Sequence, residues 1–331
     1  MRTITLEEHY ATPAFMAGPG RRLKEMADSA RAHPQVTGGF KQIVAQLCDL
    51  GEGRIAEMEA AGIDMQVLSL TAPGAEQLAA AEAVELARAA NDTLAEAVCR
   101  YPRRFGGFAA LPTPAPEVAA DELARLVREH GFKGAAINGH TQGRYLDDEF
   151  FWPILARAEA LQVPIYLHPT SPQPAVTQAL YSGNFSPQVS YLLADAAWGW
   201  HIETATHVLR LILSGAFDRF PGLQLIIGHL GETLPFMLQR FDRTLPTQVT
   251  NLQRPISGYL RENVHYTFSG FNYLPTFLDL LLQVGVERIM FSADYPYSAM
   301  APARAFLEGL PLSPADRERI AHGNAERLLR L

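Results

Sequence analysis

Eight short apolar segments, each followed by a stretch that favours a helix, recur along this chain of 331 residues. Strands that alternate with helices favour a parallel sheet, because two parallel strands need a long crossover connection. The repeated order predicts an α/β fold in which the eight strands close as a (β/α)8 TIM barrel. The predicted strands span residues 3–6, 65–70, 105–111, 132–138, 163–168, 223–229, 264–269 and 288–294.

The connections are predicted to be helical, and no linker or repeated motif divides the chain. We therefore expect one barrel domain over residues 1–331, in which residues 300–331 supply two closing helices. Residues 11–50, which Gly and Pro interrupt, are expected to form an inserted irregular segment that could cover a site as a lid. The predicted helices span residues 53–61, 75–100, 116–129, 149–161, 189–197, 202–217, 233–245, 275–284, 301–310 and 314–329.

An open, doubly wound sheet is the alternative to a barrel. Such a sheet normally carries a Gly-rich phosphate-binding turn after its first strand. Glu7, Glu8 and His9 occupy that position here, and this difference favours the barrel.

The composition is that of a globular protein. Hydrophobic residues make up 48% of the chain, and the formal net charge is −7. No basic block suggests nucleic acid, and neither a bilayer-spanning run nor the apolar stretch of a signal peptide is present. We therefore expect a cytoplasmic protein that binds neither nucleic acid nor membranes. Cys48 and Cys99 are expected to be small buried hydrophobic residues rather than a disulfide pair.

The first predicted strand ends in two side chains that bind metals, Glu7 and His9. Side chains alternate along a strand, so these two point to one side and Glu8 to the other. A carboxylate and an imidazole on one side of a strand end can grip one divalent cation. An ordinary strand that ends in polar residues is the alternative, and the spacing alone does not separate the two.

Polar residues also end other predicted strands, namely Asn138, His168, His229 and Asp294. Each has a structural alternative: a single strand histidine is more often a satisfied core residue, and Asp294 could simply form a turn. In a barrel, however, reactive groups lie at the C-terminal strand ends, so these residues are expected to meet. The predicted metal ligands are Glu7, His9, His168 and Asp294.

This ligand set suits Zn²⁺ or Mn²⁺ better than Ca²⁺ or copper, because it mixes carboxylates with imidazoles. One divalent metal is expected. His229 is predicted to lie beside it as a proton shuttle, and Glu232, three residues later, can orient His229 by a hydrogen bond.

Six segments carry the motifs of a known family: Leu6–His9, Ile165–Pro169, Trp198–Thr204, Gly228–Glu232, Phe291–Pro296 and Ile320–Leu329. With these motifs the sequence resembles the amidohydrolase superfamily over nearly its whole length. The branch it resembles contains aminocarboxymuconate-semialdehyde decarboxylase and the hydroxybenzoate decarboxylases. The first motif has Glu7 in place of the first His of the usual His-x-His.

The resemblance implies the same four metal ligands and makes Asp294, His229 and Glu232 the proton-handling set. It also places Trp200 on the wall of an aromatic pocket and Arg240 near the anionic end of the substrate. Core packing is the alternative for the tryptophan, and a surface salt bridge is the alternative for the arginine. Asn138 completes the predicted substrate-binding residues, which are Trp200, Arg240 and Asn138.

The first functional hypothesis is reversible, non-oxidative decarboxylation of an ortho-hydroxy aromatic acid, such as a dihydroxybenzoate or salicylate. The carboxylate and the phenolic oxygen of the substrate would bind the metal together. Asp294, shared between the metal and His229, would pass a proton to the ring carbon that carries the carboxyl group. No organic cofactor is required, because the phenol supplies the electron sink.

Hydrolysis of an amide, lactone or ester is the second hypothesis, with a metal-bound water and Asp294 as its general base. No bridging Lys ends the fourth predicted strand, where Lys133 lies early and Asn138 ends it, and this mildly disfavours a binuclear hydrolase. A non-enzymatic metal-binding barrel is the third, and it predicts that Asp294→Asn leaves any activity unchanged.

The expected partners are a small aromatic acid and further copies of the chain, as a homodimer or homotetramer. The apolar helix within Val208–Phe217 could serve such an interface, although burial inside the subunit is an equal alternative.

Overall fold

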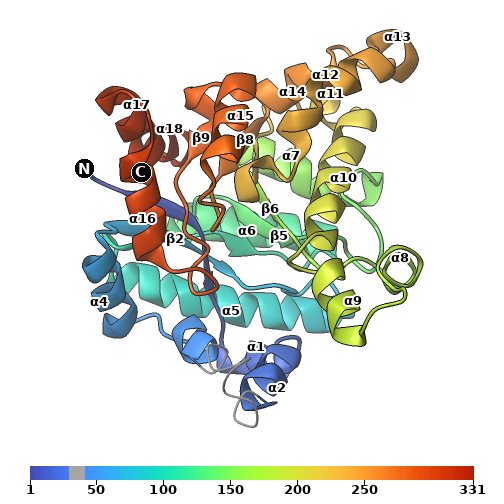
Figure 1. Ribbon diagram of the computed structural model, residues 1–331. Helices are drawn as coiled ribbons and strands as arrows, with labels where there is room; N and C mark the ends of the chain where they lie inside the picture. Colours follow the sequence, from blue (N-terminus) through green and yellow to red (C-terminus); the bar gives the residue numbers. More distant parts are fainter. Residues whose placement is uncertain (30–41) are drawn as a thin grey trace.

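The computed structural model describes residues 1–29 and 42–331 and shows parallel strands surrounded by helices (Figure 1). Strands β1 to β3 form one sheet and β4 to β9 another, and every neighbouring pair is parallel. Backbone hydrogen bonds link the two sheets, from Lys133 N–H to Gly107 O at 2.8 Å and from Leu6 N–H to Phe291 O at 3.2 Å. The strands thus follow the order of a (β/α)8 barrel: β1 (Ile4–Tyr10), β2 (Met65–Leu70), β3 (Phe105–Gly107), β4 (Ala109–Ala110), β5 (Ala135–Asn138), β6 (Ile165–His168), β7 (Leu225–Ile227), β8 (Val264–Thr267) and β9 (Ile289–Met290).

Two predicted strands differ from the observed ones. The third is interrupted at Phe108 and forms β3 and β4. The eighth was predicted over 288–294 but is regular only over β9. The reason lies in its hydrogen bonds, because the N–H groups of Ala293 and Tyr295 donate to the carboxylate of Glu8 instead of to a neighbouring strand.

A bulge in β1 decides which side chains face the inside of the barrel. The register with β2 shifts between Leu6 and Glu8, so Glu7 is an extra residue without a partner, and its φ is 77°. Leu6 belongs to the inner core. The bulge lets Glu7 join it on the same side, together with His9. Simple alternation predicted correctly that Glu7 and His9 share a side, but the bulge is what turns that side inward.

The helices surround the strands, and α16 to α18 lie on the side where both chain ends are found (Figure 1). Their bounds are α1 (Pro13–Ala17), α2 (Arg21–Ser29), α4 (Glu52–Ala61), α5 (Ala80–Arg100), α6 (Pro116–His130), α7 (Trp152–Leu161), α8 (Pro174–Leu180), α9 (Pro187–Ala194), α10 (Gly199–Leu213), α11 (Ala216–Arg219), α12 (Leu234–Thr244), α13 (Thr247–Thr250), α14 (Ile256–Glu262), α15 (Leu274–Val284), α16 (Met300–Gly309), α17 (Pro314–Glu318) and α18 (Asn324–Leu329).

The apolar core has two parts. The larger part packs the strands against the surrounding helices. The smaller part fills the inside of the ring of strands, and α18 contributes to it, so a closing helix seals the barrel interior. Its buried members are Ile4, Leu6, Met65, Val67, Phe108, Ala136, Tyr166, Ile226, Met290, Ala325 and Leu329.

The segment 11–50 is less irregular than predicted. Thr12 accepts a hydrogen bond from Phe15 N–H and Pro13 occupies the first turn, and together they start α1. Helix α2 follows it. Residues 30–41 lie outside the described part of the chain, so the predicted lid stays a prediction.

Two further expectations concern the surface. Cys48 and Cys99 were expected to be buried, but both are free and exposed. Cys99 lies on the solvent face of α5, and Cys48 lies in a turn before α4. Among the described residues, no helix has both the length and the apolar character needed to cross a bilayer.

Candidate metal centre

The four predicted ligands meet at the C-terminal ends of their strands. Glu7 and His9 come from β1, His168 ends β6, and Asp294 follows β9. One donor atom from each lies within 4.8 Å of the others. His9 Nε2 is 3.1 Å from Asp294 Oδ1, and His168 Nε2 is 3.4 Å from Glu7 Oε1. Four donors therefore surround one small volume, as a single cation requires.

The Glu7 carboxylate is held at one oxygen and open at the other. Its Oε2 accepts hydrogen bonds from the hydroxyls of Tyr166, Ser269 and Thr267. Its buried Oε1 has no hydrogen-bond partner among the described residues, and neither has His9 Nε2, despite the contact with Asp294. Buried polar atoms are nearly always satisfied, so these two open atoms fit a bound cation.

The pKa shifts of two predicted ligands, Glu7 and His168, are also compatible with a bound cation. Burial raises the pKa of Glu7, even though the positive charge of His229 opposes the shift. Burial also lowers the pKa of His168 well below its usual range, and His9 and His229 add to this effect. His168 is therefore neutral with a lone pair to donate. A bound cation would provide the positive charge that stabilises the buried Glu7 carboxylate in its ionised form.

Backbone strain is concentrated at the same strand ends. Among the non-glycine residues with positive φ angles, several lie at these strand ends, including Glu7 (77°), His229 (51°), Ser269 (48°) and Asp294 (68°). Such conformations cost about 1–3 kcal/mol each and persist where the surroundings hold them, typically at functional sites. The strain marks this end of the barrel as the one built for chemistry.

Glu232 links two imidazoles beside the four ligands. Its Oε1 contacts His229 Nδ1 and its Oε2 contacts His201 Nδ1, both at 2.6 Å. The other side of His229 faces the centre, with Nε2 3.8 Å from Glu7 Oε1. Burial alone would lower the pKa of His229, but the charges of Glu232 and Glu7 outweigh it and raise the pKa to about 10. His229 therefore carries a proton at neutral pH.

A cavity of about 740 Å³ opens beside His229 and Glu232. Trp198, which is 48% exposed, lines this cavity, whereas Trp200 is not among its lining residues. The indole N–H of Trp200 instead donates to His201 Nε2 at 3.2 Å. The residue predicted for the pocket wall thus reaches the site only through His201, and its neighbour Trp198 takes the wall position.

The other two predicted substrate-binding residues lie in different settings. Asn138 pairs in register with His168, and its side-chain amide donates to Glu76 at 3.4 Å. Arg240 is exposed on α12 and does not line the cavity beside His229. Leu238 faces the core, and a residue two positions later points about 200° around the helix axis. The role of Arg240 stays a prediction.

Several residues of the site were not predicted. The hydroxyl donors Tyr166 and Ser269 lie on predicted strands. Tyr166 is two residues before His168 and therefore on the same side of its strand, and this spacing could have identified it. Tyr297 lies with its ring centroid 5.5 Å from that of His9, and its hydroxyl contacts Thr71 Oγ1 at 2.6 Å.

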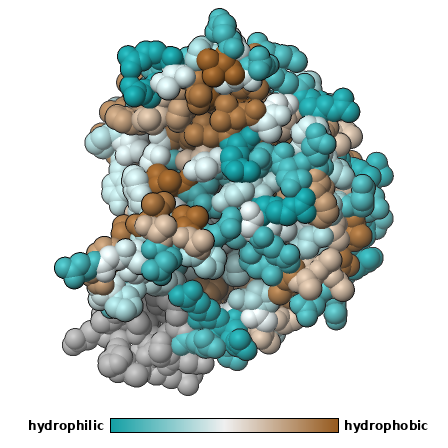
Figure 2. Space-filling model, turned by 90° about the vertical axis from the view of Figure 1, so that its right-hand side faces the viewer, coloured by the Kyte–Doolittle hydropathy of each residue, from teal (hydrophilic) through white to brown (hydrophobic). Residues whose placement is uncertain are grey.

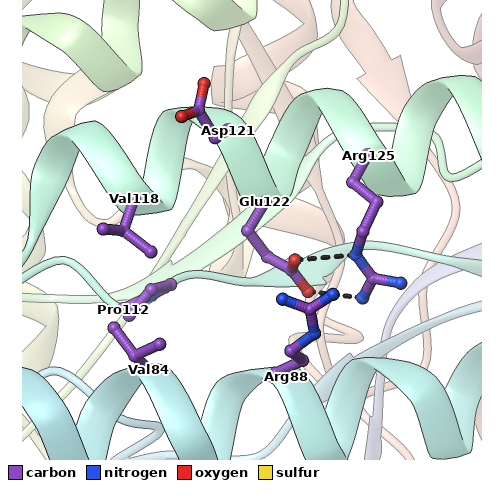
Figure 3. Close-up of a pocket in the computed structure, with 7 residues that line it drawn as sticks. All are labelled: Val84, Arg88, Pro112, Val118, Asp121, Glu122 and Arg125. Atoms are coloured by element: carbon purple, nitrogen blue, oxygen red, sulfur yellow. Dashed lines mark hydrogen bonds and ion pairs between the residues drawn. The ribbon is translucent and has the colours of Figure 1, made fainter.

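A hollow between α5 and α6 holds a different charge cluster (Figure 3). Its volume is about 150 Å³. Glu122 accepts hydrogen bonds from Arg125 at 2.7 and 2.8 Å and from Asn91 at 3.0 Å, and Arg88 points toward the same carboxylate. These charges are already paired, and no predicted ligand lines the hollow, so it is no candidate for the catalytic site.

Comparison with known proteins identifies the family of this chain and several similar decarboxylases. A family model described as amidohydrolase matches residues 17–331. The gamma-resorcylate decarboxylase of a Polaromonas species is 39% identical over 99% of this chain and 98% of its own. A 2,6-dihydroxybenzoate decarboxylase solved with 2,6-dihydroxybenzoate is 36% identical, has a TM-score of 0.88 and covers 100% of both chains.

A third relative was solved with a metal. The dihydroxybenzoic acid decarboxylase from Polaromonas, with bound manganese and the inhibitor 2-nitroresorcinol, is 38% identical and has a TM-score of 0.89. The match covers 100% of this chain and 97% of that one. The chain belongs to the amidohydrolase family. Within that family its full-length relatives include gamma-resorcylate and dihydroxybenzoate decarboxylases.

Proposed function

We propose that this protein is a metal-dependent, non-oxidative decarboxylase of an ortho-hydroxy aromatic acid of the dihydroxybenzoate or salicylate type. The observation that carries the proposal is the convergence of Glu7, His9, His168 and Asp294, with Glu7 Oε1 and His9 Nε2 buried and without hydrogen bonds among the described residues. The full-length relatives named for this reaction support the choice of decarboxylation over hydrolysis.

These four residues would hold one divalent cation, Mn²⁺ or Zn²⁺. The manganese bound in the Polaromonas relative supports Mn²⁺. The bound cation would act as a Lewis acid that fixes the substrate carboxylate and the neighbouring phenolic oxygen. The hydroxyls around Glu7 Oε2 hold that carboxylate so that Oε1 points to the cation.

The chain itself moves the proton. His229 is protonated and held by Glu232, and its charge interacts with that of Asp294. We assign His229 the role of supplying a proton to Asp294, and Asp294 that of passing it to the ring carbon that carries the carboxylate. A C–H bond forms at that carbon, the C–C bond to the carboxylate breaks, CO₂ leaves and the ring regains its aromaticity. The reaction should run in reverse at high bicarbonate.

The substrate ring is assigned to the space between the centre and the cavity beside His229. Trp198 and Phe271 line this cavity with aromatic surface, which suits a flat ring. Trp200, Arg240 and Asn138 remain predicted substrate-binding residues, and Asn138 has the best placement because it lies beside His168 in register.

We also propose that the protein forms a homodimer or homotetramer. The helix within Val208–Phe217 does not serve this purpose, because most of its apolar residues are buried in the subunit. Figure 2 instead shows apolar patches on the side that carries α8 and α9. Large exposed apolar patches are typical of interfaces, and light scattering on the purified protein tests this proposal. The exposed residues in this region are Leu180, Phe185, Val189 and Leu192.

The test of the activity is CO₂ release from 2,6-dihydroxybenzoate, 2,3-dihydroxybenzoate and salicylate by the Mn²⁺-loaded and Zn²⁺-loaded protein. Turnover of at least one acid, lost with a chelator and restored by the metal, is expected. Absence of turnover across a broad panel of hydroxyaryl acids, with cleavage of esters or lactones instead, would replace the proposal by the hydrolase alternative. The cytoplasmic location stays a prediction.

A further inference from the structure

Glu8, the residue between the two ligands of β1, faces away from the metal centre and contacts the turn that carries Asp294. It is fully buried. Its Oε1 accepts a hydrogen bond from Ala293 N–H at 2.8 Å, and its Oε2 accepts one from Tyr295 N–H at 3.1 Å. The two oxygens of one carboxylate therefore bind the two peptide N–H groups that flank Asp294.

This clamp acts on a strained residue. Asp294 has a φ of 68°, a conformation that a non-glycine residue keeps only when its surroundings hold it. Each of the two peptide N–H groups donates to a different oxygen of Glu8, so this one carboxyl group fixes the turn at two points. A third bond, from His9 N–H to Tyr295 O at 2.7 Å, ties the same turn to β1. The strand that supplies two ligands thus also holds the backbone of a third.

A buried positive charge supports the clamp from behind. Gln66 Nε2 donates to Glu8 Oε2 at 3.3 Å, and Gln66 Oε1 accepts from Arg54 Nη1 at 3.4 Å. Arg54, also fully buried, donates from Nη2 to the carbonyl of His9 at 2.7 Å. Arg54 thus fixes the backbone of a predicted ligand directly and holds the Glu8 carboxyl group through Gln66.

We propose that Glu8 is a positioning residue for Asp294: its carboxylate holds the turn that aims the Asp294 side chain at the cation and at the substrate ring. The inference rests on the proposed metal centre and deepens it. Loss of a group that orients a metal ligand typically costs about 10–100-fold in metal affinity or activity. A loss of that size is expected when one oxygen of Glu8 is replaced by an amide.

The experiment compares Glu8→Gln with the wild-type protein and with two other variants. Glu8→Gln keeps the shape, but its amide N–H₂ faces a backbone N–H instead of accepting from it. Glu76→Gln is the matched control, because Glu76 is also buried and also accepts a backbone N–H at a strand end, from Asn138 at 2.7 Å. Asp294→Asn tests the metal centre itself. Mn²⁺ binding to each apoprotein is titrated by electron paramagnetic resonance, and thermal unfolding is recorded in parallel.

Three results are expected. The wild-type protein binds one Mn²⁺, Glu8→Gln binds it about 10-fold or more weakly with a changed Mn²⁺ spectrum, and Glu76→Gln binds it with wild-type affinity even if its unfolding temperature falls. At saturating Mn²⁺, Glu8→Gln should lower kcat more than it changes KM, because the proton donor is misplaced while the rest of the pocket is intact.

The failures of the two proposals are distinguishable. If the wild-type protein binds no Mn²⁺ or Zn²⁺, or if Asp294→Asn binds it equally well, the metal centre and the inference fall together. If the wild-type protein binds and Asp294→Asn does not, an unchanged affinity, spectrum and kcat in Glu8→Gln overturn the inference alone. If Glu8→Gln does not fold, Glu8→Asp decides, because it keeps the charge but is too short to reach both N–H groups. Wild-type Mn²⁺ binding by Glu8→Asp would contradict the proposal.

Discussion

The metal centre and the hollow between α5 and α6 are both clusters of charged side chains. Of the two, only the metal centre has buried polar atoms that lack a hydrogen-bond partner among the described residues. In the hollow, Arg125 donates to Glu122 (Figure 3). Glu122 also accepts from Asn91, and Arg125 also donates to Asp92 at 2.8 Å. In the centre, Glu7 Oε1 and His9 Nε2 are buried and make no hydrogen bond within the part of the chain that the structure describes.

The difference separates a structural cluster from a functional one. Charges that neutralise one another on a helix surface stabilise the fold slightly and need no further partner. Buried donors and acceptors left open cost free energy, unless a ligand completes them. The strained backbones of Glu7, His229 and Asp294 occur at the second kind of cluster. Charge density alone therefore does not locate the site; unsatisfied buried atoms on ligand-type side chains that converge on one volume do.

The largest expected effect is the difference in kcat between Asp294→Asn and the same substitution at an aspartate of the hollow, Asp121. Asp294→Asn removes a ligand and the proton donor to the ring, so kcat should fall by about 10²–10⁴-fold. Asp121→Asn, at the rim of the hollow with a 77% exposed side chain, should leave kcat unchanged. Steady-state decarboxylation assays of both variants measure the contrast. Equal activities in the two variants would remove the distinction between the clusters.

A smaller effect is expected from a hydroxyl that holds a ligand. Tyr166→Phe removes one donor to Glu7 Oε2 and should weaken Mn²⁺ binding by about 10-fold. Tyr259→Phe is its control, because that tyrosine is equally buried but donates to Asp218 far along the chain from any ligand. Mn²⁺ titrations that give the same affinity for both variants would contradict the role of the Tyr166 hydroxyl.

The pH dependence of stability should also differ between the clusters. The pKa of His229 is raised to about 10 in the folded protein, against about 6.5 when unfolded. Its contribution to the free energy of unfolding is therefore complete below pH 6.5 and is lost as the pH rises through 10. Urea unfolding of the metal-free protein should show the wild-type advantage over His229→Gln shrinking between pH 6 and pH 10. An advantage that does not change with pH would refute the assignment.

The smallest effect on activity is expected in the hollow. Arg125→Met breaks its ion pairs with Glu122 and Asp92 and should lower the free energy of unfolding by about 1–3 kcal/mol, because the buried Glu122 carboxylate loses a partner that donates two hydrogen bonds. This loss should not vary between pH 6 and pH 10, because arginine stays charged throughout. Activity and Mn²⁺ affinity should match the wild type. A large loss of activity would show that this cluster is more than structural.

The sequence predicted the order of strands and helices because apolar periodicity and Gly and Pro positions are local signals. It also brought Glu7, His9, His168 and Asp294 together, because strand ends of a parallel barrel converge. It did not reveal the bulge at Glu7, since a bulge depends on pairing with β2. It also predicted too long a last strand, because the hydrogen bonds from Ala293 and Tyr295 to Glu8 depend on the folded structure and leave no local signal.

For a related reason, local sequence signals do not establish which residues line the pocket wall. Trp198 and Trp200 stand two residues apart, and the choice between them depends on how the chain enters α10, which begins at Gly199. Arg240 was assigned by resemblance, but the face that α12 turns inward is set by packing. Cys99 was misplaced because an amphipathic helix exposes one face, and the hydrophobicity of a residue alone does not say which. Cys48 lies in a turn, for which the sequence offered no periodic signal.

The most direct test of the central claim is a crystal structure of the Mn²⁺-loaded protein with anomalous diffraction data. We predict a single manganese peak that is directly coordinated by one atom each of Glu7, His9, His168 and Asp294. A peak held instead by His201, His229 and Glu232, the second group of close donors, or the absence of any peak between the four residues, would contradict the account.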